Sequence, residues 1–79
     1  MDKQAAKTEV KAAKAALSAI EAEISAARVA LGVSPLETVW PCPSDLRSRL
    51  YAARARVDTA DKALFYAFRK EIHHAYVNA

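Results

Sequence analysis

The sequence predicts an all-α protein, an antiparallel two-helix hairpin with a coiled-coil-like seam. Two long segments place apolar residues in alternating steps of four and three, which is the heptad pattern of packed helices. One Gly and three Pro in 79 residues argue against a turn-rich β domain. A chain of this size holds one domain, so residues 1–79 are expected to form a single helical unit.

The first helix is predicted over residues 2–31, a stretch rich in Ala, Lys and Glu without Gly or Pro. Gly32 follows at the position where a helix commonly ends with a residue in the left-handed conformation. One column of the seam is mostly alanine, which lets a neighbouring backbone come close. The apolar positions of this helix are Ala6, Val10, Ala13, Leu17, Ile20, Ile24, Ala27 and Leu31.

The second helix is predicted over residues 45–77, with Ser44 as N-cap and Asp45 in the first turn. Its seam runs from Leu46 to Leu64 and then shifts by one residue. Two rods of matched length and a short connection predict an antiparallel pair. In this antiparallel pairing Leu31 is expected to lie near Leu46 and Leu64 near Ala13, which puts Phe68 near Glu9 and Ile72 near Ala5.

The connector is residues 32–43. Ser34, Pro35 and Glu37 form a capping box, which predicts one short helical turn near residues 35–38. Val39 to Pro43 should be extended, because residues that precede proline avoid the α region. We expect Trp40, with Val33, Leu36 and Leu46, to plug the closed end of the hairpin.

The open end carries more apolar bulk than one neighbouring helix can cover. Large apolar side chains after Leu64 spread over about half the circumference of the second helix. An aromatic patch of this kind marks an interaction site, filled either by a second copy in a four-helix bundle or by a different protein. The sequence favours a second copy and a different protein about equally, and the two do not exclude each other. The candidate partner-binding residues are Phe65, Phe68, Arg69, Ile72, His73 and Tyr76, flanked by Lys3 and Lys7.

The net charge is +3, which permits but does not demand an acidic partner or nucleic acid. Lysines recur along one face of the first helix without an acid at i+4, and basic residues stand near one line of the second. Such unpaired rows could contact phosphates or an acidic surface, although a solvated face is their commoner meaning. These candidates, the basis of a nucleic-acid-binding homodimer as the alternative function, are Lys11, Lys14, Arg49, Arg56 and Lys70. Arg54, Asp58, Asp61 and Lys62 are instead expected to pair among themselves.

No catalytic, cofactor or metal site is predicted. His73 and His74 diverge by about 100° on a helix and cannot clasp one metal from one face. Cys42 has no base in reach and no second cysteine, so a non-enzymatic protein of the reducing cytoplasm is expected. No apolar run reaches the length of a membrane span, and residues 1–16 do not have the character of a signal peptide. A concave small-molecule site is not expected on two packed helices.

In its size, its Ala-rich helices, its lack of a catalytic motif and its aromatic end from Phe65 to Val77, the chain resembles small inhibitors encoded by bacteriophages. Anti-CRISPR proteins belong to that group. The resemblance implies docking on a CRISPR effector complex, with basic and aromatic side chains blocking a site that the nucleic acid uses. The chain is basic, unlike the acidic DNA mimics of the group, which favours wedging onto an acidic or apolar protein surface.

Overall fold

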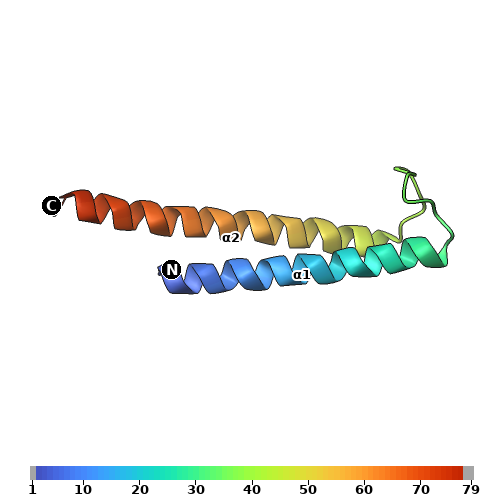
Figure 1. Ribbon diagram of the computed structural model, residues 1–79, viewed down its shortest axis with the longest axis horizontal. Helices are drawn as coiled ribbons and strands as arrows, with labels where there is room; N and C mark the ends of the chain where they lie inside the picture. Colours follow the sequence, from blue (N-terminus) through green and yellow to red (C-terminus); the bar gives the residue numbers. More distant parts are fainter. Residues whose placement is uncertain (1, 78–79) are drawn as a thin grey trace.

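The computed structural model describes the backbone of residues 2–77, together with the side chains of residues 2–70 and of Ile72. It contains helix α1 (Lys3–Ala30) and helix α2 (Ser44–Val77), which lie antiparallel as a rod of 61 × 19 × 17 Å (Figure 1). The predicted all-α hairpin is therefore confirmed. No strand occurs among residues 2–77.

Both helices begin close to the predicted residues. Asp2 caps α1, and its side-chain Oδ1 accepts a hydrogen bond of 2.7 Å from the Ala5 N–H. For α2 the expected cap is displaced by one position. Ser44 is already helical, and the carbonyl of Pro43 accepts from the Arg47 N–H at 3.2 Å. Ser44 thus stands inside the first turn instead of capping it.

The end of α1 is a Schellman motif built around the single glycine. Leu31 is the C-cap, and Gly32 takes the left-handed conformation with φ of 71°. The Gly32 N–H donates to the Val29 carbonyl at 3.1 Å, and the Val33 N–H donates to the Arg28 carbonyl at 3.0 Å. These two bonds satisfy carbonyls that the end of a helix leaves without partners. The predicted role of Gly32 is confirmed.

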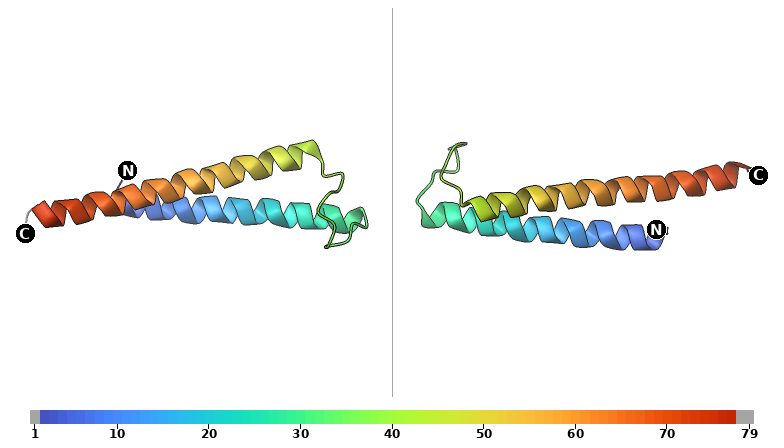
Figure 2. Two further views of the ribbon diagram at one scale, coloured as in Figure 1. Left: turned by 90° about the horizontal axis from the view of Figure 1, so that it is seen from above. Right: turned by 180° about the vertical axis from the view of Figure 1, so that it is seen from behind.

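The two helices pack through small side chains. No large side chain described here is fully buried, so the core consists of methyl groups and one valine. Val57 and Leu64 pack against it from α2 and stay partly exposed. The helices cross at a shallow angle (Figure 2), and a core of this size gives a small chain only marginal stability. The buried residues are Ala6, Val10, Ala13, Ala53 and Ala60.

Two inter-helix ion pairs lie along one edge of the seam. Arg56 donates to both carboxylate oxygens of Glu9 at 2.8 and 3.2 Å, and Arg49 donates to both oxygens of Glu23 at 3.2 and 2.6 Å. The hydrogen bonds from Arg56 lower the pKa of Glu9, and the same bonds raise the pKa of Arg56. The expectation that Arg49 and Arg56 are unpaired is wrong, because their acids come from α1 and not from their own helix.

The predicted register of the two helices is wrong. Phe68 lies beside Lys3 and Lys7 instead of Glu9, which pairs with Arg56. Consequently α2 continues past the start of α1, as all three views show (Figures 1 and 2). The 13 residues from Leu31 to Pro43 between the helices do not force their ends together, so ion pairs and alanine contacts decide where the helices sit.

The connector forms turns and no helix. The Glu37 N–H donates to the Ser34 carbonyl at 3.0 Å, and the Leu36 N–H donates to the Ser34 hydroxyl at 3.2 Å. The capping box therefore closes a single turn, and the helical turn predicted near residues 35–38 is absent. Further along, the Cys42 N–H donates to the Trp40 carbonyl at 2.8 Å, which closes a γ-turn where an extended chain was expected.

Arg28 anchors the connector to α1. Its guanidinium donates to the carbonyls of Ser34 at 2.9 Å and Glu37 at 2.6 Å, and it lies 5.3 Å from the centre of the Trp40 ring. Leu36 is 91% exposed and takes no part in the expected apolar plug. The other three members, Trp40, Val33 and Leu46, are half-buried. A cation–π contact and two hydrogen bonds thus hold a segment that apolar burial was expected to hold.

Charge reversal tests the ion pairs. The variant Glu9→Arg places two arginines opposite each other, so we expect a lower midpoint of thermal unfolding, measured by circular dichroism. The double variant with Glu9→Arg and Arg56→Glu restores an opposite-charge pair and should recover most of the loss, with the recovery shrinking in high salt. Equal midpoints for the single and double variants would mean that this pair does not help to set the register.

Candidate functional site

Four bulky side chains near the end of α2 form the aromatic end, defined as Phe65, Tyr66, Phe68 and Ile72. Their exposed fractions are 62%, 61%, 37% and 62%. Side chains of this size are normally buried, and neighbouring exposed ones mark an interaction surface. The hairpin buries alanines and leaves these four larger side chains exposed.

The exposure follows from the register of the two helices. α1 begins at Lys3, which lies beside Phe68, and α2 runs on beyond that point (Figure 1). Ile72 stands one turn further along, past the start of α1. Phe65 and Tyr66 are level with α1, but their positions on the helix turn them to its flanks. α1 therefore covers only part of the aromatic end.

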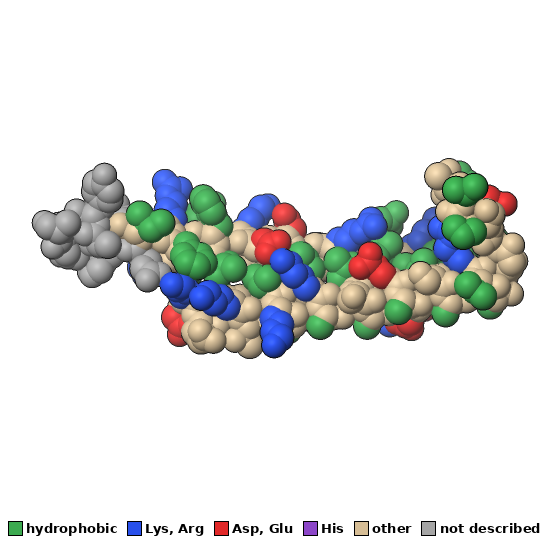
Figure 3. Space-filling view, in the orientation of Figure 1, with side chains coloured by type: hydrophobic (Ala, Val, Ile, Leu, Met, Phe, Trp, Pro, Cys, Tyr) green, Lys and Arg blue, Asp and Glu red, His purple; other side chains and the backbone are tan. Residues whose placement is uncertain are grey.

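Cations rim the aromatic end on the α1 side. The Nζ atoms of Lys3 and Lys7 lie 4.7 and 5.7 Å from the centre of the Phe68 ring, within cation–π range. Phe65 and Tyr66 pack edge to face with ring centres 5.8 Å apart. In Figure 3, hydrophobic side chains of α2 lie next to the Lys and Arg side chains at this end. The surface offers apolar area and positive charge together.

The structure brings together part of the predicted contact set. Phe68, Lys3 and Lys7 meet directly, and Arg69 is exposed on the turn that follows Phe68. The side chains of His73 and Tyr76 lie outside the described residues. Tyr66 belongs to the site although it was absent from the predicted contact residues. Tyr66 is one of the large apolar side chains that spread around the second helix after Leu64. The sequence alone did not show which of these side chains α1 covers.

The predicted cationic candidates divide into two kinds. Lys11, Lys14 and Lys70 are exposed side chains with no ion pair to any described residue. Arg49 and Arg56 are neutralised by carboxylates of α1. Among the predicted surface pairs, Lys62 contacts Asp58 at 3.0 Å, which raises the pKa of Lys62. A continuous basic row on α2 does not form.

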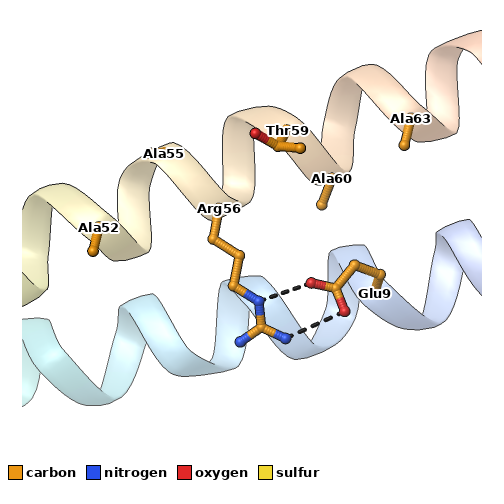
Figure 4. A pocket seen from close by; sticks show the side chains of 7 residues that line it. All are labelled: Glu9, Ala52, Ala55, Arg56, Thr59, Ala60 and Ala63. Atoms are coloured by element: carbon orange, nitrogen blue, oxygen red, sulfur yellow. Dashed lines mark hydrogen bonds and ion pairs between the residues drawn. The ribbon is translucent and has the colours of Figure 1, made fainter.

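An open groove of about 460 Å³ lies beside the Glu9–Arg56 pair (Figure 4). Arg56 reaches across it from α2 to α1, and Thr59 adds a hydroxyl. The rest of its lining is methyl groups, from Ala52, Ala55, Ala60 and Ala63. Such a surface admits another helix closely but carries no nucleophile with a base beside it.

A second groove, of about 480 Å³, lies between the connector and α2. Three arginines, two aromatic rings and the free, half-buried Cys42 meet there. Sequence reasoning missed this site, because it exists only once Arg28 holds the connector in place. Its principal residues are Arg28, Trp40, Cys42, Arg47, Tyr51 and Arg54.

Within the described part of the chain, no three His, Cys, Asp or Glu residues are grouped so that they could hold a metal ion. The helices, as far as the structure describes them, include none with the length and apolar character needed to cross a membrane. Comparisons with protein-family models, curated proteins and solved structures find no match to this chain. Proposals about its function therefore depend on its own residues and geometry.

Proposed function

We propose that this chain is a non-enzymatic protein-binding module that docks on a larger protein or nucleoprotein complex through its aromatic end. The observation that carries the proposal is the set of four bulky side chains left 37–62% exposed beside two lysines. Aromatic residues mixed with cations are the composition of interface hot spots.

The energetics support an external partner for the aromatic end. Fully burying one large apolar side chain contributes about 1.5–3 kcal/mol, whereas the hairpin's own core consists of alanines and one valine. Docking would bury large apolar side chains that folding of the isolated chain leaves exposed. Because α1 starts at Lys3, it does not reach far enough to cover the aromatic end, and a partner would cover it instead.

The side chains of the aromatic end indicate what kind of surface the partner has. An apolar pocket would receive Phe65 and Ile72, and carboxylates at its rim would meet Lys3 and Lys7. The alternative function, a homodimer that binds nucleic acid, is weaker because Arg49 and Arg56 already pair with acids. A homodimer through the aromatic end remains the competing occupant, and the experiment below separates it from a different protein.

The resemblance to small phage-encoded inhibitors makes a CRISPR effector complex the first partner to test. In that setting the aromatic end wedges onto the effector and blocks access of the nucleic acid. The lone Cys42, which has no intrachain disulfide partner, is consistent with the cytoplasm as the compartment where this binding takes place.

Site-specific photocrosslinking tests the proposal. Benzoylphenylalanine at position 65 should give one discrete crosslink to another protein in cells that produce the chain. Position 36 is the matched control, because Leu36 is 91% exposed at the opposite end of the rod. A crosslink to a second copy of the chain would identify a homodimer, and equal crosslinking at both positions would remove the aromatic end as the docking site.

A further inference from the structure

We propose a second binding site, separate from the aromatic end: the groove between the connector and α2 binds an acidic peptide segment that also carries apolar side chains. The two sites lie toward opposite ends of the rod, since the groove faces the start of α2 and the aromatic end lies near its finish. Binding at one can therefore be removed while the other stays intact.

The groove has an apolar lining that reaches solvent. Half-buried Ile24 and Leu50 lie toward the seam, while Val39 and Tyr51 are 88% and 63% exposed. Trp40 contributes a ring to the same wall. A ligand that fills about 480 Å³ here buries these apolar surfaces, so it must offer apolar groups in return.

Every charged residue that lines the groove is positive. Arg28, Arg47 and Arg54 line it, and no Asp or Glu is among its lining residues. The hydrogen bonds of Arg28 go to two backbone carbonyls, which leave its positive charge uncompensated. Asp58, the acid four residues after Arg54, contacts Lys62 instead. The groove thus offers Arg47 and Arg54 to carboxylates of a ligand, and the charge of Arg28 adds to their positive potential.

The arginines on the two edges of the hairpin differ in whether a carboxylate pairs with them. Arg49 and Arg56 each make a two-point contact with a glutamate of α1. Arg47 and Arg54 stand seven residues apart on the other side of α2, where α1 supplies no carboxylate to the groove. Unpaired arginines beside aromatic rings are a recognition surface for acidic groups.

A peptide fits this surface better than a nucleic-acid strand. Phosphates would satisfy the arginines but would leave Val39 and Leu50 without an apolar partner. One face of Trp40 is already covered by Arg28 at 5.3 Å, which removes that face as a stacking platform for bases. Glutamates and leucines of a peptide satisfy both the charges and the apolar wall.

The single tryptophan provides the measurement. Because Trp40 is the only tryptophan and lines the groove, its fluorescence should change when a ligand enters. The probe is a short synthetic peptide of glutamates and leucines, titrated into the full chain. The control peptide replaces each glutamate by glutamine, and a single-stranded oligonucleotide forms a third arm.

We expect the Glu/Leu peptide to bind the parent chain. Its affinity for the double variant with Arg47→Gln and Arg54→Gln should be lower by about tenfold or more. The matched control, Lys11→Gln with Lys14→Gln, removes the same charge outside the groove and should bind like the parent chain. Equal weakening in both variants, or equal binding of the glutamine peptide, would overturn the proposal. Binding of the oligonucleotide in place of the peptide would also overturn it.

Discussion

Replacing Phe68 and Ile72 by alanine is expected to weaken binding to the photocrosslinked partner by about 100-fold or more. Truncation of a hot-spot residue costs about 2 kcal/mol or more, and both side chains stand in the exposed cluster. The helix content should stay unchanged, because neither residue belongs to the buried set and alanine favours a helix. Isothermal titration calorimetry and circular dichroism measure the two quantities.

The matched control removes apolar bulk at the other end of the rod. Val29 and Leu36 are 80% and 91% exposed, so the double variant Val29→Ala with Leu36→Ala loses comparable surface. Its affinity should equal that of the parent chain. If both double variants lose affinity to the same degree, the binding depends on general hydrophobicity and not on the aromatic end.

The variant Ala13→Leu is expected to lower the free energy of unfolding by about 2 kcal/mol. Ala13 is fully buried against Val10 and Ala60, at a point where the helices approach closely. Inserting a larger side chain there pushes the helices apart, at the usual cost of overpacking of about 1–3 kcal/mol. For a chain of this length the thermal midpoint should fall by roughly 10 °C, measured by circular dichroism.

Ala12 provides the comparison for this effect. It is the exposed neighbour of Ala13 on the same helix, so Ala12→Leu makes the same chemical change outside the seam. Its free energy of unfolding should stay within about 0.5 kcal/mol of the parent value. A stabilised Ala13→Leu variant would show that the seam has room, which contradicts close packing through alanine.

The heptad pattern was enough to predict the helices and much of the seam. It placed Val10, Ala13 and Ala60 on the seam of the two helices, and the structure buries all three together. Gly32 predicted the end of α1 because only glycine adopts a positive φ there without strain. The excess of aromatic side chains on the second helix likewise predicted exposed bulk, and Phe65 and Ile72 are each 62% exposed.

The register and the connector could not be predicted in the same way. Sliding one heptad helix along another keeps apolar residues facing, so the pattern alone does not choose among registers. The pairs Arg56–Glu9 and Arg49–Glu23 join residues far apart in sequence, beyond the reach of i+4 rules. The groove depends on Arg28 binding the connector carbonyls, a contact that no local motif encodes.

Hydroxyl-radical footprinting of the free chain measures whether the aromatic end is exposed, under conditions where sedimentation gives the monomer mass of 8.6 kDa. Relative to the intrinsic reactivity of each side chain, Phe65 and Tyr66 should be oxidised as readily as the exposed Tyr51, while the buried Val10 is protected. Protection of Phe65 and Tyr66 in the monomer, at the level of Val10, would mean that a single chain already covers the aromatic end and that no partner is needed there.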